Sequence, residues 1–210
     1  MADRRAGPKA KAASGVIKPA GAEASLAGPS SRQRMVQAAA ALLSEKGLDG
    51  ASFSEVIERS GAPRGSIYHH FPAGKDALTA EAVQLVGDQV LGLLRASDAK
   101  TPAQVVGRFV AAWRQVLSRS DCQAGCAIAA VANESLSHPG LASIAAGVFS
   151  AWEKELLARL VASGLPKPKA AAAAPLILAA VEGALVLCRA RQELGPIDAV
   201  GKALEAYVSG

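Results

Sequence analysis

The chain has 210 residues, half of them hydrophobic and one fifth charged, and its formal net charge is +5. This composition supports a packed core, while three cysteines (Cys122, Cys126 and Cys188) are too few, and odd in number, for a disulfide framework. The N-terminus carries no apolar segment of signal-peptide length, and the longest uncharged stretch, 135–152, is a poor membrane span. We therefore expect a soluble, cytoplasmic protein with no membrane partner.

Alanine and leucine dominate the sequence, whereas β-branched and aromatic residues are sparse, which favours an all-α fold. We expect a disordered basic arm over 1–29, a helix-turn-helix domain over 30–75, and a larger helical domain for ligand binding and dimerisation over 76–210.

Positive charge is concentrated at the front of the chain. The first 80 residues hold 11 Lys and Arg against 7 Asp and Glu, a balance that favours a polyphosphate partner. Basic residues of the arm could touch DNA phosphates, although a solubilising tail is the simpler interpretation: Arg4, Arg5, Lys9, Lys11 and Lys18.

The first predicted helix covers 31–46, where apolar residues recur at a spacing of three to four, and Gly47 ends it as a C-cap. A second helix begins near Phe53, because Ser52 and Glu55 have the spacing of a capping box. This helix ends before Gly61.

A tight turn at 61–63 leads into a short third helix over 63–70, with proline in its first turn. The fourth helix runs over 75–96, and the next begins at Thr101 and Pro102. Further helices are predicted over 125–134, 141–163, 169–192 and 197–208, and no convincing strand is found.

The second and third helices, with the glycine-containing turn between them, make a helix-turn-helix, whose second helix enters the major groove of DNA. Ile67 and Phe71 lie four residues apart and are expected to face the core. Arg64 can make two hydrogen bonds to guanine, and Gly65 allows close approach of the backbone. The predicted DNA-binding residues are Ser52, Arg64, Gly65, Ser66, Tyr68, His69, His70 and Lys75.

Residues 32–78 resemble the DNA-binding domain of the TetR/AcrR repressor family. The residues that carry the resemblance are Ala38-Ala39, Leu42-Leu43, Lys46-Gly47, Ser52, Val56-Ile57, Gly61, the run 65–71, Lys75 and Leu78. The resemblance implies DNA contacts from the outward residues of the third helix and from the lysine that opens the fourth. Pro63 departs from the family, which often has a Ser or Thr cap there.

Two segments resemble a narrower subgroup, the LmrA/YxaF-like regulators. They are residues 60–72 and residues 125–131, where Ala127 stands in place of the proline typical of that subgroup. The resemblance implies an all-α C-terminal domain that binds a small molecule, but it does not identify the ligand.

A lone helix-turn-helix is small, so a homodimer on a palindromic double-stranded DNA operator is expected. Helices 141–163 and 169–192 are the predicted interface, in which Leu176, Ile177, Ala180, Gly183, Ala184 and Leu187 could form either a dimer face or part of the monomer core. A small-molecule inducer of unknown identity would bind between helices and release the DNA. Its candidate contacts are Phe109, Trp113, Asn133, Glu134, Phe149 and Trp152.

Other functions are less well supported by the sequence. His69 and His70 diverge by about 100° on a helix, and no hydrolase, metalloprotease or phosphate-loop motif is present, so we expect no enzyme, metal or cofactor. A module that docks another protein through these helices would not explain the excess of basic residues in the first 80 positions. DNA binding that activates transcription, or that is independent of a ligand, stays open.

Overall fold

The computed structural model describes residues 28–210, and within that range the chain is all-α, as the composition predicts. The predicted arm lies outside the described residues, apart from its last two positions. The helices are α1 (Ser31–Gly50), α2 (Phe53–Ser60), α3 (Ser66–His70), α4 (Lys75–Arg95), α5 (Pro102–Arg119), α6 (Ala127–Glu134), α7 (Pro139–Ala162), α8 (Lys167–Arg191) and α9 (Gly195–Ser209), with a 3-10 turn η1 (Ser135–Ser137).

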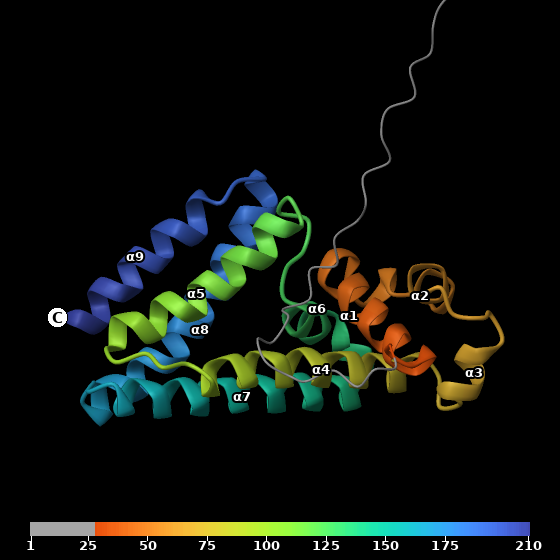
Figure 1. Cartoon of the computed structure of the whole chain (residues 1–210), viewed down its shortest axis with the longest axis horizontal. Coiled ribbons are helices and arrows are strands. Elements are labelled where there is room, and N and C mark those ends of the chain that lie inside the picture. Colours follow the sequence, from red (N-terminus) through yellow and green to blue (C-terminus); the bar gives the residue numbers. More distant parts are fainter. Residues whose placement is uncertain (1–27) are drawn as a thin grey trace, which may run out of the picture.

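Helices α1, α2 and α3 gather at one end of the molecule, around the N-terminal end of α4 (Figure 1). The capping box at the start of α1 comes from Ser30 and Gln33, each of which accepts from the other's backbone N–H. Gly47 interrupts α1 with a φ of +77°, so the predicted stop appears as a kink and the chain then continues helically to Gly50. Only glycine adopts this conformation readily.

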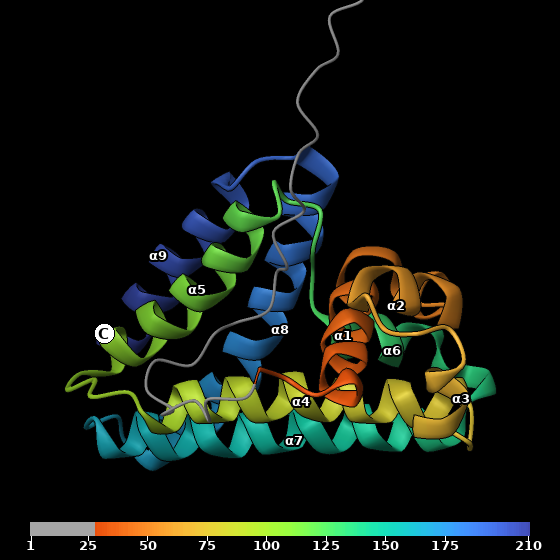
Figure 2. The same cartoon turned by 45° about the vertical axis from the view of Figure 1, so that its right-hand side comes forward.

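Helices α4 and α7 run side by side in the same direction along the base of the molecule (Figure 2). Asp76 near the start of α4 meets His138 at the start of α7, at 2.9 Å. Further along, the indole N–H of Trp152 donates to the carbonyl of Gly87 at 3.0 Å. A Cβ at Gly87 would stand 3.0 Å from a methyl group of Val148, so the missing side chain allows the two helices to approach closely.

Helices α5, α8 and α9 form the opposite end (Figures 1 and 2), and the short α6 packs against α1, α4 and α7. α9 runs antiparallel to α5, and Gly201 packs directly against Val110. The ion pair between Arg114 and Asp198 joins the same two helices at 2.6 Å. A single continuous apolar core extends from α1 to α9, so the helix-turn-helix end is packed directly onto the rest of the chain.

Three local predictions are wrong in detail, and α7, α8 and α9 each begin two residues before the predicted start. The third helix begins at Ser66 rather than residue 63, because residues 63–65 form a turn in which the N–H of Ser66 bonds to the carbonyl of Pro63. Ser52 caps α2, but no reciprocal bond from Glu55 is recorded, and Glu55 instead pairs with Lys46. α6 begins at Ala127 rather than Gly125.

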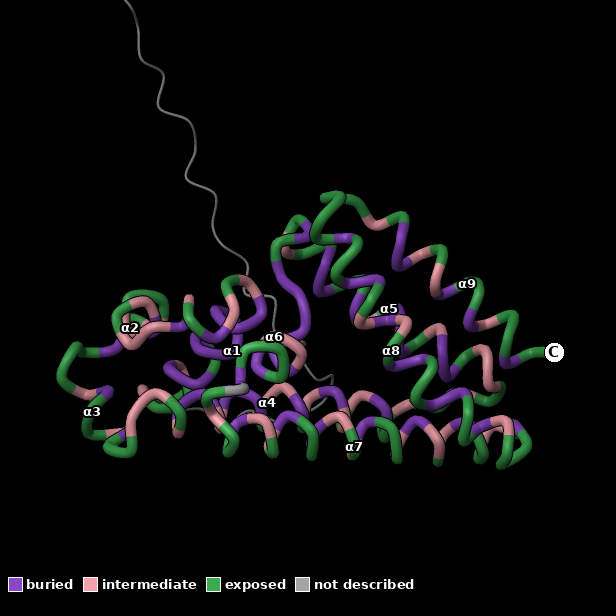
Figure 3. Tube along the Cα trace, turned by 180° about the vertical axis from the view of Figure 1, so that it is seen from behind, coloured by how far each residue is buried: buried purple, intermediate pink, exposed green. Residues whose placement is uncertain are grey.

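The apolar face of α8 is divided between the core and the surface. Ile177 and Ala184 are buried within the monomer, whereas Leu176, Val186 and Leu187 are 43%, 65% and 44% exposed. Figure 3 shows the outer turns of α8 and α9 alternating between buried and exposed. Among the described residues, α8 is the one helix long and apolar enough to cross a membrane, and 44% of the relevant window is buried inside the chain.

Candidate DNA-binding interface and effector region

The α2–turn–α3 unit is fixed by local hydrogen bonds that the sequence encodes. The hydroxyl of Ser52 accepts from the backbone N–H of Glu55 at 3.3 Å, which starts α2. Gly61 ends α2 in the left-handed conformation with a φ of +64°, and its N–H donates to the carbonyl of Ile57. The chain then turns sharply into α3.

Beyond this turn, α3 separates a buried side from an exposed side. Ile67 and Phe71 are almost fully buried, as the four-residue spacing predicts. The backbone of the turn and the outer face of α3 are open to solvent. Exposed positions are Arg64, Gly65, Tyr68 and His69, while Ser52, Ser66, His70 and Lys75 are half-buried. All eight predicted DNA contacts are therefore on or beside one helix-turn-helix.

Tyr68 is the most exposed large hydrophobic side chain of the described residues, at 68%. Its ring packs edge-on against Phe53 of α2, with ring centroids 5.7 Å apart. The aromatic contact orients the phenol without covering it. The Tyr68 hydroxyl is thus available to a partner outside this chain.

Polar contacts brace the unit from behind. Arg59 of α2 pairs with Glu45 of α1 at 2.7 Å, beside the pair between Lys46 and Glu55. Arg34 donates to the carbonyl of Ser60 at 3.2 Å and so ties the start of α1 to the end of α2. These contacts fix the orientation of α2 against α1, and the sequence analysis did not identify them.

No group of three or more His, Cys, Asp or Glu side chains arranged to hold a metal ion occurs in the part of the chain that the structure describes. The rings of His69 and His70 have centroids 5.5 Å apart and are inclined by 63°. The geometry presents these histidines as separate groups on the surface of α3.

Four of the six candidate inducer contacts form an aromatic cluster deep in the C-terminal part. Trp152 is fully buried and packs edge-on against Trp113 and Phe149, with centroids 6.0 and 5.7 Å apart. Trp113 in turn contacts Phe109 at 6.4 Å. The cluster links α5 to α7 and, through the bond from Trp152 to Gly87, to α4.

The other two candidates, Asn133 and Glu134, line a separate groove of about 310 Å³. The groove lies where the end of α1 meets α6 and α8. The carboxylate of Glu134 accepts hydrogen bonds from the backbone N–H groups of Leu48 and Asp49, at 3.0 and 3.3 Å. Glu134 therefore ties α6 to the segment that leads from α1 into α2.

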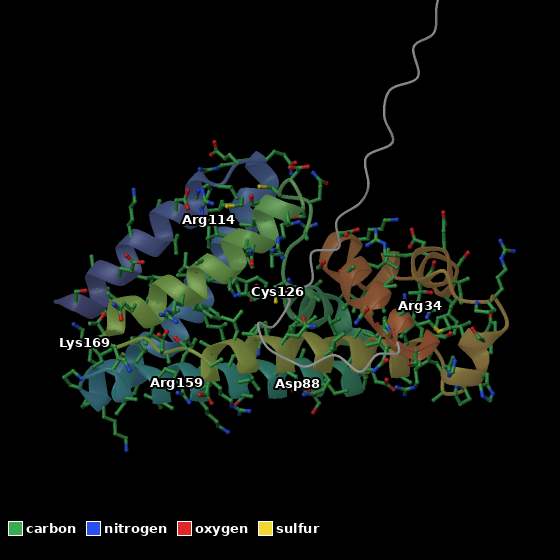
Figure 4. All side chains as sticks on the ribbon, viewed as in Figure 1. Arg34, Asp88, Arg114, Cys126, Arg159 and Lys169 are labelled. Atoms are coloured by element: carbon green, nitrogen blue, oxygen red, sulfur yellow. The ribbon has the colours of Figure 1, made fainter. Side chains whose placement is uncertain are left out.

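The same groove holds a half-buried acid, Glu182, that the sequence analysis missed. Burial raises the pKa of Glu182 to about 7, although the neighbouring thiol of Cys126 acts to lower it. Burial likewise raises the pKa of Cys126 well above its ordinary range, so this group stays a neutral thiol. Figure 4 places Cys126 at the centre of the molecule, at the start of α6.

A sequence signal for Glu182 did exist, since it is the one charged residue between Lys169 and Arg189. A charged side chain in such an apolar helix is rarely buried without a function or a partner.

Comparison with known proteins identifies both parts of the chain. Residues 35–82 match the model for bacterial regulatory proteins of the tetR family, and residues 102–203 match the C-terminal domain of LmrA/YxaF-like transcriptional regulators. An uncharacterized HTH-type transcriptional regulator of Mycobacterium tuberculosis is 37% identical over 179 residues, covering 82% of this chain and 91% of the relative. The HTH-type transcriptional regulator LmrA of Bacillus subtilis is 26% identical, covering 80% and 90%.

Solved structures show the same architecture. A TetR transcriptional regulator from Legionella pneumophila superposes with a TM-score of 0.78 at 20% identity, covering 86% of this chain and 98% of that one. A transcriptional regulator from Rhodococcus superposes with a TM-score of 0.67 at 28% identity, covering 86% and 95%.

Proposed function

This chain belongs to the TetR family of bacterial transcriptional regulators, and we propose that it is a ligand-responsive repressor that binds a palindromic operator as a homodimer. Its relatives are DNA-binding regulators rather than enzymes, in agreement with the sequence analysis. The main support for DNA binding is the exposed face of α3, where Tyr68 is open to solvent and Arg64 lies just before the first turn of the helix. We place the protein in the cytoplasm, where its DNA partner lies.

The proposed contacts divide by what they can read. Arg64 is the one exposed side chain at the start of α3 that can bond a guanine edge twice, and it carries base discrimination. Ser52, Ser66, Tyr68, His70 and Lys75 donate to phosphates, which fixes the position of the helix rather than the sequence read. Gly65 allows the DNA backbone to approach closely. A Cβ at this position would meet no protein atom within 4 Å, so a side chain would extend into the space that the DNA is proposed to occupy. His69 lies beside them on the exposed face.

We propose that the dimer interface uses the exposed residues of α8 and α9 rather than α7 and α8. Leu176 and Leu187, which share one side of α8, expose apolar surface, and Tyr207 adds a 41% exposed ring from α9. Two copies of this helix pair make a four-helix bundle. The two α3 helices then need a separation of about 34–36 Å to enter successive major grooves.

Residues 30–75 act as the DNA-binding domain and 76–210 as the effector and dimerisation domain in this proposal. Helix α4 connects them covalently, and Glu134 connects them through the end of α1. An inducer that binds better when α6 and α1 are displaced shifts the population away from the DNA-binding arrangement. Such linkage commonly amounts to about 1–3 kcal/mol, or a 5- to 150-fold loss of affinity. Inducer contacts are proposed among the aromatic cluster and the groove at Asn133 and Glu134.

Fluorescence anisotropy with the DNA upstream of the gene for this protein tests the proposal at two salt concentrations. We expect salt-dependent binding, and Arg64→Ala should weaken it by about 5- to 150-fold and relax the preference for one base. Arg119→Ala is the matched control, because Arg119 is an exposed arginine at the far end of α5. Equal losses in both variants, or no sequence preference after selection from random DNA, would refute the assignment.

A further inference from the structure

The groove between α1, α6 and α8 combines an apolar wall with several charged side chains. Most of those charges already have partners. Lys46 pairs with Glu55, and Glu45 pairs with Arg59. Arg189 donates to the carbonyl of Glu45 at 3.0 Å, and Glu134 accepts from two backbone N–H groups.

Glu182 differs from these residues. Its Oε1 atom is buried and has no hydrogen-bond partner among residues 28–210, and the thiol of Cys126 is the neighbour that acts on the pKa of its carboxyl. A buried carboxylate without a full set of partners destabilises the folded chain. Such groups persist where a ligand completes them, so the orphaned oxygen indicates a missing partner that carries donors.

We propose that Glu182 is the specificity-determining acid of an effector site in this groove, and that the site takes a small apolar molecule carrying one basic amine. The proposal rests on the proposed function and specifies its ligand class. The groove has a volume of about 310 Å³, near the lower end of the range for small-molecule sites. Alanine and leucine side chains suit an apolar body: Ala129, Ala130 and Leu185.

The single free acid sets the charge of the ligand. An ammonium group offers up to three donors and an opposite charge, so it satisfies Oε1 and offsets the burial of the carboxylate together. A second cation would find no free acid, because Glu45 and Glu134 are already bonded. A carboxylate ligand would be repelled by the ionised form of Glu182.

The location also provides a route to the DNA-binding end. Lys46 and Gly47 at the end of α1 line the groove, and Glu134 holds the residues that follow them. A Cβ at Gly47 would stand 2.3 Å from a carboxylate oxygen of Glu134, so the two segments are in direct contact. A ligand that binds beside Glu182 therefore either displaces the contact between Gly47 and Glu134 or fits the groove with that contact in place.

Three probes of one shape separate charge from apolar contact: 2-naphthylmethylamine, 2-naphthylmethanol and 2-naphthoate. Calorimetric titration of the full dimeric protein should show the amine binding at least about tenfold more tightly than the alcohol, with no detectable binding of the acid. Glu182→Gln should remove the preference for the amine, and Glu182→Asp, which keeps the charge, should retain it. Glu153→Gln, an exposed glutamate of α7, is the matched control.

The inference is overturned if amine and alcohol bind alike, if Glu182→Gln keeps the preference, or if wild type binds no amine at about 1 mM. Operator anisotropy then separates this inference from the proposed function. In the presence of the amine, wild type should lose operator affinity at least about fivefold while Glu182→Gln does not. If operator affinity is unchanged when the amine is bound, the effector role is refuted. If the protein does not bind DNA in the absence of any probe, the proposed function is refuted.

Discussion

Replacing Glu182 by glutamine removes a negative charge from a half-buried side chain and leaves its shape nearly unchanged. The carboxyl of Glu182 has its pKa raised from the ordinary 4.5 to about 7, mainly by burial. The folded chain therefore holds this proton more tightly than the unfolded chain does. Stability from this proton is fully present below pH 4.5 and is lost as the pH rises through 7.

The magnitude follows from the displacement of the pKa. One pH unit corresponds to about 1.4 kcal/mol, so full ionisation removes at most about 3 kcal/mol from the free energy of unfolding. Glu182 keeps some contact with solvent, and water relaxation reduces the loss, so we expect about 1–3 kcal/mol. Glutamine does not titrate, and its variant should avoid the loss.

Urea unfolding at pH 5 and pH 8, at one protein concentration, measures the effect. The stability of Glu182→Gln relative to wild type should increase by about 1–3 kcal/mol between the two pH values. Glu153→Gln should show no comparable change, because Glu153 is exposed and forms no ion pair with any residue from 28 to 210. A Glu182→Gln difference that is the same at both pH values would refute the argument that the acid is buried without adequate partners.

Three other substitutions test contacts between helices and the proposed dimer interface. Glu134→Gln weakens the bonds to the N–H groups of Leu48 and Asp49, and thermal melting should show a loss of about 1–2 kcal/mol together with weaker operator binding. Trp152→Phe leaves the buried carbonyl of Gly87 without its donor, so chemical denaturation should show a loss of about 1–3 kcal/mol, and unchanged stability would contradict the bond. Leu187→Glu places a charge in the proposed dimer face, so light scattering should detect monomer where wild type is dimeric; a dimeric variant would move the interface elsewhere.

The local features of the helix-turn-helix could be predicted because their signals lie within a few residues of each other. Ser52 precedes the N–H group that it caps by three residues, and Gly61 follows the helix that it ends. Ile67 and Phe71 share a face by helical periodicity alone. The start of α3 was predicted three residues too early. The turn closed by the hydrogen bond from the N–H of Ser66 to the carbonyl of Pro63 has sequence preferences similar to those of a first helical turn.

The effector region could not be predicted in the same way, because its contacts join distant parts of the chain. Glu134 bonds to residues 86 and 85 positions earlier, and no local pattern encodes that distance. Asn133 and Glu134 were grouped with the aromatic residues as one cavity, whereas the structure places them in a different groove. Ile177 and Ala184 also looked like a dimer face, since periodicity identifies an apolar side but not what covers it.

The end of α1 is held by four hydrogen bonds that use its backbone atoms. The N–H of Gly125 donates to the carbonyl of Ser44 at 2.8 Å, Arg189 donates to the carbonyl of Glu45, and Glu134 accepts from Leu48 and Asp49. These contacts come from the link before α6, from α8 and from the end of α6. Because these contacts fix the backbone itself, we expect the proposed effector response to reach α2, which is braced against α1, through a change in the spacing of α6 and α8.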